Sequence, residues 1–179
     1  MKAWKHFKTI TYHKYLVCKG CFKVGLYKQG LLHDMSKYSP SEFLVGAKYF
    51  QGDRSPNNAE REDIGYSSAW LHHKGRNKHH YEYWCDYSSR IPGGIIPVPM
   101  PDKYIAEMFM DRIAASKVYK KEAYTDRSPL EYYQLGKDPA PMHDNTREKL
   151  ETLLNLLAEK GEQETFRYIR ENLVKKQSS

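Results

Sequence analysis

The spacing of apolar residues predicts a chain that is helical over most of its length. From Trp4 to Lys28, apolar residues recur every three or four positions, which is the repeat of an α-helix with one buried face. Gly30 follows this segment and is placed to end the helix. His13 lies on the apolar face, so we expect its side chain to point inward, as either a hydrogen-bonded core residue or a metal ligand.

Serine and proline mark the start of the next helix. The stretch Ser39-Pro40-Ser41-Glu42 has the form of a capping box, in which Ser39 accepts from a free backbone N–H and Glu42 reaches back to the helix start. It predicts a helix from Pro40 to about Phe50, followed by a polar surface loop over 51–58. A further helix is expected over 59–73.

The second half of the chain opens with a proline-rich segment. The prolines between Ile91 and Pro101 exclude a helix and a central strand, so we expect an extended loop that is either a connector or one wall of a pocket. Asp102 is placed to cap a helix that runs to about Lys121. A short helix begins at Ser128, a loop follows over 136–145, and no segment predicts a strand.

The C-terminal segment reads as two helices. Apolar residues at helical spacing form two stripes, namely Leu150, Leu153, Leu154 and Leu157 before Gly161, and Phe166, Ile169 and Leu173 after it. With 179 residues, 40% of them hydrophobic, the chain can bury one sizeable core but is too short for two ordinary domains. We therefore expect a single all-α domain in which residues 146–179 form a helical hairpin packed on residues 1–145.

Composition excludes several classes of protein. No apolar run is long enough to cross a bilayer, and the first residues lack the apolar segment of a signal peptide, so a cytoplasmic location is the expectation. Three cysteines, with Cys85 far from Cys18 and Cys21, supply neither a disulfide framework nor a four-thiolate zinc site.

The formal net charge of +7 and the isoelectric point near 9.1 favour an anionic partner. That partner is either a phosphorylated small molecule or nucleic acid. The lysines gather in the first predicted helix, but a solvated surface is the simpler interpretation, so nucleic acid is the less favoured partner. The oligomeric state stays open.

Candidate chemistry centres on the adjacent pair His33 and Asp34. Imidazole nitrogen and carboxylate oxygen suit divalent ions such as Fe, Mn, Co, Ni, Zn or Mg, and adjacent ligands lose little chain entropy when they converge on one ion. The alternative is that Asp34 caps a helix beside a solvated histidine. Asp111 is expected at the apolar face of the helix over 102–121, where its carboxylate either binds a metal or pairs with Arg112 or the backbone.

A histidine cluster follows the pair. Four of the eight histidines, His72, His73, His79 and His80, lie in a short stretch flanked by aromatic residues. Because unpaired imidazoles are costly in a partly enclosed setting, we expect a functional role for at least one member of these pairs. Spacing from Trp70 slightly favours His73 and His80 as the inward members, and Asn77 could orient one of them.

Taken together, these residues resemble the HD-domain superfamily of metal-dependent phosphohydrolases. The stretch His33-Asp34-Met35-Ser36-Lys37 is similar to the frequent His-Asp-Ile-Gly-Lys of that superfamily, with Ser36 in place of glycine and Lys37 retained. The likeness is closer to a bacterial and phage family related to that superfamily, with a His-Asp-x-Ser-Lys motif and a following His-His…Asn-x-His-His segment. It covers about residues 12–119 and leaves the C-terminal hairpin outside.

The resemblance implies an all-helical bundle and a set of ligands. It makes residues 1–145 an HD-like metal-binding core in which one divalent ion is bound by His13, His33, Asp34 and Asp111. The histidines His72, His73, His79 and His80 would bind a second ion or orient the substrate. Lys74 stands where cyclic-dinucleotide hydrolases carry glutamate after the histidine pair, which argues against that substrate.

The implied activity is hydrolysis of a phosphomonoester or phosphoanhydride, with a nucleotide as the first candidate substrate and a metal-activated water as the nucleophile. Asp34 would hold or deprotonate the water, Lys37 would neutralise the phosphate, and His73 or His80 would protonate the leaving oxygen. Two alternatives stay open. One is an HD-like di-iron oxygenase, and the other is a non-catalytic, metal-stabilised binding protein.

Overall fold

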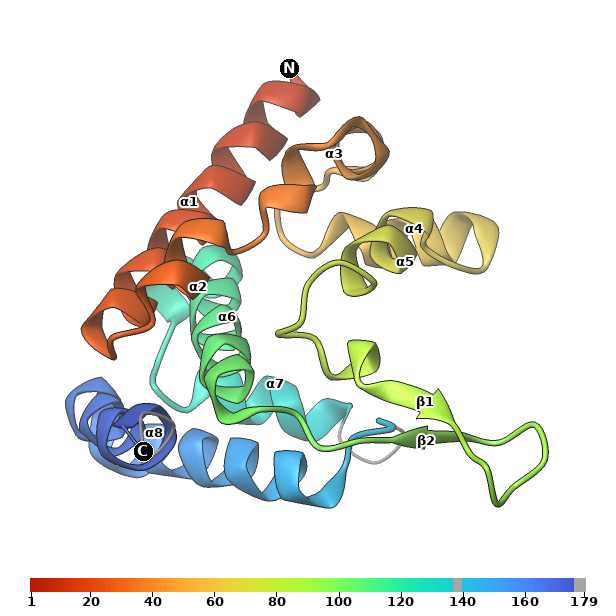
Figure 1. The fold of residues 1–179 in the computed structure, drawn as a ribbon. Helices are drawn as coiled ribbons and strands as arrows, with labels where there is room; N and C mark the ends of the chain where they lie inside the picture. Colours follow the sequence, from red (N-terminus) through yellow and green to blue (C-terminus); the bar gives the residue numbers. More distant parts are fainter. Residues whose placement is uncertain (137–139, 176–179) are drawn as a thin grey trace.

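The structure is a computed structural model that describes residues 1–136 and 140–175. Helices make up most of it, with one small β-hairpin at the side, as Figure 1 shows. The predicted all-α class is therefore confirmed. Part of the loop expected over 136–145 and the last residues of the expected hairpin lie outside the described residues. Within the part described, no helix combines the length and apolar character needed to span a membrane.

The first expected helix is in fact two. Helix α1 (Lys2–Lys23) ends before Gly25, and the short helix α2 (Tyr27–Leu32) begins just after it. Gly25 has φ of 85°, in the left-handed region that favours glycine, so the chain turns there and the prediction of one helix to Lys28 was wrong. Gly30 lies inside α2 instead of ending a helix. Its missing side chain lets α2 approach the α1 backbone at Cys18, which a Cβ atom would meet at 3.2 Å.

A short 3₁₀-helix, η1 (Met35–Tyr38), leads into α3 (Pro40–Tyr49), which begins where the sequence indicated. The helix expected over 59–73 is again divided, into α4 (Pro56–Ile64) and α5 (Ser68–Lys74). Gly65 ends α4 with φ of 84°, and the Ser67 hydroxyl accepts from the Trp70 backbone N–H to start α5.

The proline-rich segment contains a strand that the sequence did not predict. After η2 (Tyr81–Tyr83), strand β1 (Cys85–Tyr87) pairs antiparallel with β2 (Ile95–Pro97), with Cys85 opposite Pro97. Both strands are largely exposed, so they lack the alternation of buried and exposed positions that reveals a strand. Figure 1 shows this hairpin extending away from the helices.

Helix α6 (Asp102–Lys120) forms the centre of the core and packs along α1. Pro101 occupies the N-cap position of α6, so Asp102 does not cap the helix as expected. The Asp102 carboxylate instead pairs with Lys149 Nζ at 2.6 Å. The buried residues of α6 are apolar except for Glu107, and Asp111 is half-buried. This burial places carboxylates of α6 beside the inner face of α1.

The remaining helices close the core. They are η3 (Lys121–Ala123), α7 (Ser128–Leu135), α8 (Asp144–Ile169) and the π-type turn η4 (Arg170–Val174). Inside α8, Gly161 has φ of 77° and ψ of 178°, so the helix breaks there as the sequence predicted. Leu150 and Ile169, one on each side of the break, are both fully buried in the core.

Candidate metal centre

The pair His33 and Asp34 sits at a constrained turn between α2 and η1. Asp34 has φ of 53°, in the left-handed region that non-glycine residues rarely adopt. Lys14 of α1 holds the turn by donating from Nζ to the carbonyl oxygens of Leu31 at 2.7 Å and His33 at 2.8 Å. Both members of the pair are buried, at 1% and 2% exposure. Backbone strain at a buried polar pair is typical of a functional site.

The first group of close ligand atoms comes from α1, this turn and α6. It consists of His13, His33, Asp34 and Asp111, whose ligand atoms all lie within 4.8 Å of one another. His13 Nε2 lies 2.9 Å from Asp111 Oδ1, and His33 Nε2 lies 3.3 Å from Asp34 Oδ2. Residues nearly a hundred positions apart therefore converge on one point.

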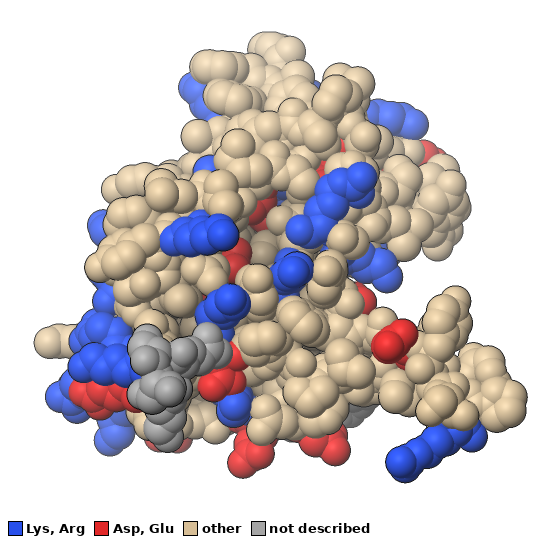
Figure 2. Space-filling model, viewed as in Figure 1, with Lys and Arg blue, Asp and Glu red and all other residues tan. Residues whose placement is uncertain are grey.

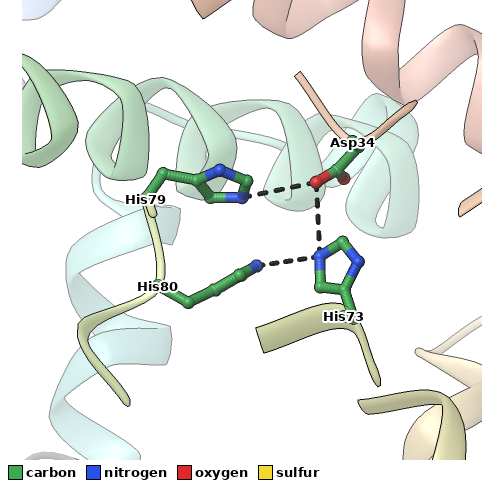
Figure 3. Close-up of side chains that lie close together, drawn as sticks. All are labelled: Asp34, His73, His79 and His80. Atoms are coloured by element: carbon green, nitrogen blue, oxygen red, sulfur yellow. Dashed lines mark hydrogen bonds and ion pairs between the residues drawn. The ribbon is translucent and has the colours of Figure 1, made fainter. Parts of the chain in front are cut away.

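The second group shares Asp34 and draws its other members from α5 and the loop after it. It consists of Asp34, His73, His79 and His80 (Figure 3). Asp34 Oδ1 lies 3.2 Å from His73 Nε2 and 3.3 Å from His79 Nε2, and His73 Nε2 lies 2.9 Å from His80 Nε2. The Oδ1 atom of Asp34 thus faces the second group while Oδ2 faces the first.

Glu107 of α6 connects the two groups, and sequence reasoning missed it. Its Oε1 accepts from Nδ1 of His33 at 2.9 Å and lies 3.2 Å from Nδ1 of His79. Burial would raise the pKa of Glu107, but its hydrogen bonds with the two histidines lower it. Because an ionised carboxylate can only accept, each Nδ1 carries the proton and each Nε2 faces the centre. The available signal was an acidic residue one turn before Asp111 on an apolar helix face.

Glu42 orients a histidine of the second group, and the expectation that it closes a capping box was wrong. Its Oε2 accepts from His73 Nδ1 at 2.8 Å and its Oε1 lies 2.6 Å from His72 Nδ1, so the side chain points inward and closes no capping box. Among the residues described, the Ser39 hydroxyl has no hydrogen-bond partner. Asn77 donates to Ser36 Oγ at 2.8 Å, which ties the loop after α5 to η1.

Apart from Asp34 Oδ2, which lies 2.6 Å from Lys37 Nζ, three buried atoms at this centre have no hydrogen-bond partner in the described part of the chain, namely Asp34 Oδ1, His33 Nε2 and His79 Nε2. A buried polar atom without a partner costs about 1–3 kcal/mol. All three are metal-binding atom types, and nitrogen and oxygen ligands together suit a divalent transition metal. The buried His and Asp groups are therefore fitted to hold a metal ion.

Charges at the centre keep its carboxylates ionised. Burial would raise the pKa of Asp34, but His33 and Lys37, whose Nζ lies 2.6 Å from Asp34 Oδ2, lower it well below its usual range. For Asp111, burial also opposes ionisation, but His13, whose Nε2 lies 2.9 Å from Asp111 Oδ1, and the nearby His33 lower the pKa well below its usual range. Ionised carboxylates are the form that a metal ion requires.

The histidines of the centre differ in the direction in which their pKa is shifted. Burial lowers the pKa of His13 and, together with the neighbouring His79 and His73, lowers that of His80 well below its usual range. Burial also acts on His33 and His73, but the Asp34 carboxylate outweighs it and raises their pKa. Metal ligation requires the neutral imidazole, so a metal ion and a proton compete for His33 and His73.

A cavity of about 750 Å³ opens beside the centre. Cationic side chains line it, including Lys37, Arg112 and Lys120. Its wall also carries aromatic residues, namely Phe50, Trp70, Tyr81, Tyr119, Tyr132 and Tyr133. Figure 2 shows a hollow on this face with Lys and Arg side chains around it and acidic side chains within it.

Comparison with protein families gives one match. The model of a family of unknown function, DUF5662, matches residues 2–156. This chain belongs to DUF5662. No curated protein and no solved structure matches the chain. Every ligand atom of the two groups in this DUF5662 protein lies inside the matched segment.

The structure of the DUF5662 chain brings together most of the residues singled out in the sequence. Its two groups contain His13, His33, Asp34, Asp111, His73, His79 and His80, while Lys37 contacts Asp34. His72 lies outside both groups, half-buried, with its Nδ1 toward Glu42. The sequence did not decide which histidine of each pair points inward. The structure places His73 of the first pair, and both His79 and His80 of the second, at the centre.

Proposed function

We propose that this protein is a metal-dependent phosphohydrolase that acts on a phosphorylated small molecule, with a two-ion centre bridged by Asp34. The observation that carries the proposal is the shared carboxylate of Asp34, whose two oxygens face two separate groups of ligands beside a cation-lined cavity. A divalent ion held there would lower the pKa of a bound water and offset charge on the phosphoryl group.

Lys37 is the side chain best placed to bind the transferred phosphoryl group. It lines the cavity and is anchored to Asp34 at 2.6 Å. Burial acts to lower the pKa of Lys37, but the carboxylates of Asp34 and Asp111 raise it overall, so the ammonium stays charged. A fixed positive charge in a water-poor site stabilises the charge that develops on phosphate oxygens.

Arg112 supports an anionic substrate independently. Its guanidinium lies over the Tyr133 ring, 5.4 Å from the centroid, on the wall of the same cavity. Its Nε is buried without a hydrogen-bond partner among the residues that the structure describes. Guanidinium groups pair with phosphate oxygens through two parallel hydrogen bonds. Arg112 directly follows Asp111 in α6 and lines the same cavity, so it would contact a second anionic group of the substrate.

The HD-domain resemblance supports the same activity. The order of the inward histidine, the His-Asp pair and the late aspartate is that of the superfamily, and all three elements meet at the first group. The aromatic wall formed by Trp70, Tyr81 and Tyr119 offers flat apolar faces against which a nucleobase could stack, so a nucleotide is the preferred substrate.

His80 has two mutually exclusive roles in this proposal. Its Nε2 lies 2.9 Å from His73 Nε2 and its side chain lines the cavity. As a ligand, that nitrogen would be bound; as a general acid, it would donate a proton to the leaving oxygen. Loss of bound metal in His80→Ala would assign the ligand role, whereas retained metal with reduced turnover would assign the acid role.

The activity test measures phosphate release from a panel of nucleotides and other phosphomonoesters, using protein purified without an affinity tag and supplied with divalent ions. We expect metal-dependent turnover that falls about 100-fold in Lys37→Gln, the order seen when one charge-stabilising group is removed. Lys78→Gln, an exposed lysine beyond the cavity wall, is the matched control and should keep full turnover. Metal-loaded protein that releases phosphate from no substrate would contradict the proposal.

The imidazole-rich donor set also favours a second candidate, an HD-like di-iron oxygenase. Five histidines approach the centre, against two aspartates. Imidazole with a few carboxylates is a ligand set that iron accepts. Iron retained through purification, with an absorption spectrum that changes on exposure to oxygen, would select this candidate over the phosphohydrolase.

A further inference from the structure

The net positive charge of this protein comes from its first segment. Residues 1–33 contain seven lysines and no aspartate, glutamate or arginine. In the remaining chain, 22 basic residues equal 22 acidic ones, so the formal net charge of +7 resides entirely in the first segment. Most of that segment is helix α1, which places the charge on one long element.

Not all of these lysines are available to a partner. Lys14 donates to two backbone carbonyls at the His33 turn, and Lys23 lies 3.9 Å from Glu162. Lys5, Lys8 and Lys19 are exposed and form no ion pair with any residue in the described ranges. They all lie on the face of α1 that points away from the core.

Aromatic residues occupy the same face. Trp4, Lys8, Tyr12, Tyr15, Lys19 and Phe22 follow one another at steps of three or four residues and form one ridge along α1, with Lys5 beside it. We call these seven residues the α1 ridge. Its aromatic members are exposed, with Trp4 at 61% and Tyr15 at 57%. At a rise of 1.5 Å per residue, the ridge is about 27 Å long.

The α1 ridge is separate from the metal centre. The opposite face of the same helix carries the buried residues His13 and Val17, and His13 belongs to the first ligand group. Substitutions on the ridge therefore leave the ligands in place. In Figure 1, α1 runs along the outer edge of the helices, with its core-facing side toward α6.

We propose that the α1 ridge binds single-stranded nucleic acid. Lysines would contact the phosphates, and the exposed aromatic rings would stack on unpaired bases, which a duplex does not offer. Along the ridge, one lysine follows the first aromatic residue and another precedes the last, with two tyrosines between them, so cations and rings are interleaved as phosphates and bases are in a single strand. The proposal is independent of hydrolase activity at the metal centre.

An anionic membrane is the competing partner, and the pattern disfavours it. A helix that lies in a membrane interface separates an apolar face from a charged one. The apolar face of α1 is already packed in the core, and the outer face mixes lysines with aromatic rings. Leu31 and Leu32 of α2 are also exposed, and Leu31 lies beside Lys14 in the middle of α1, so vesicles belong in the test.

The test measures fluorescence anisotropy of a labelled single-stranded oligonucleotide of about 20 nucleotides with the whole protein. If three lysines contact phosphates, the affinity should fall about 20-fold between roughly 50 and 200 mM salt, because each contact adds about −0.7 to the slope for single strands. The variant Lys5→Glu, Lys8→Glu, Lys19→Glu should bind at least about tenfold more weakly than the wild type at roughly 100 mM salt.

A control variant carries the same change in net charge elsewhere. Lys78→Glu, Arg90→Glu, Lys103→Glu alters three cations near the β-hairpin and the start of α6, and should keep its affinity within about threefold. Circular dichroism and metal content should be unchanged in both triple variants. A second ridge variant, Trp4→Ala, Tyr15→Ala, should weaken binding without changing the salt slope, because it removes stacking and no charge.

Three results would overturn the proposal. The first is equal loss of affinity in the ridge variant and its control, which would reduce the effect to net charge. The second is duplex bound as tightly as single strand. The third is binding to vesicles of anionic phospholipid with no binding to the oligonucleotide. None of these results bears on phosphate release at the metal centre, so this proposal and the proposed activity fail separately.

Discussion

At the scale of single residues, Glu107 is the residue on which the geometry of both ligand groups depends. Its carboxylate accepts from Nδ1 of His33 and lies against Nδ1 of His79, so Nε2 of both histidines faces the centre. We predict that Glu107→Gln weakens metal binding about 10–100-fold while the protein stays folded, because an uncharged amide oxygen is a weaker acceptor for the two Nδ1–H groups than the carboxylate oxygen that both of them contact. Isothermal titration of metal-free protein measures this loss.

Glu60 provides the matched control for that prediction. It is equally buried, but it accepts from Ser67 and Ser68 at the start of α5 and lies outside both ligand groups. Glu60→Gln should lower the free energy of unfolding and leave metal affinity unchanged. Equal metal affinity in Glu107→Gln and the wild type would show that Glu107 does not orient the ligands.

The sequence identified ligand candidates more readily than the residues that orient them. His33 and Asp34 are adjacent, and the paired histidines stand out in the chain, so both attract attention without a structure. Glu42 and Glu107 act behind histidines that are distant in the chain, such as His73, 31 positions from Glu42, and His33, 74 positions from Glu107. Glu42 also sits where a capping box expects glutamate, so its local pattern pointed to a different role.

At the scale of elements, the packing of α1 on α3 depends on a neutral histidine. His6 is buried against the rings of Phe43 and Phe50, and Gly46 lets the α3 backbone lie against it. Burial, with a smaller contribution from Lys37, lowers the pKa of His6 to about 4. The contact between these two helices therefore requires the uncharged imidazole.

This packing predicts a loss of stability in acid. Between pH 6.5 and about 4, the unfolded chain binds a proton at His6 that the folded protein does not, so acidification favours unfolding. We expect the free energy of unfolding to fall through this range by on the order of 2 kcal/mol from His6 alone. Urea unfolding of wild type and His6→Gln at both ends of the range, with chelator present, measures the difference. An identical pH dependence in the two proteins would contradict it.

Two helix breaks that the sequence did not predict lie at glycines. The breaks after α1 and α4 fall at Gly25 and Gly65, whose left-handed conformations turn the chain inside segments that otherwise keep a helical pattern. Gly161 was identified because one apolar stripe ends before it and another begins after it. The β-hairpin was missed because its strands are short and exposed, so burial leaves no alternating pattern.

At the scale of the whole molecule, the fold brings four separate parts of the chain to one buried point. Helix α1, the turn at Asp34, the segment that begins with α5, and helix α6 each contribute at least one ligand atom. The all-α class follows from the helical patterns, but their meeting point depends on long-range packing, which no local pattern encodes. The HD-domain resemblance indicated the ligand order, and it remains a basis for the proposed activity.

Counting the metal ions bound per chain shows whether two metal sites share Asp34, as we propose. Metal-free protein is titrated with a divalent ion, and bound metal is counted by elemental analysis in the wild type and variants. We predict two ions in the wild type, one each in Asp111→Ala and His79→Ala, and none in Asp34→Ala, since Asp34 faces both groups. His72→Ala, adjacent to a ligand but outside both groups, should keep two. Full metal content in Asp34→Ala would contradict the account.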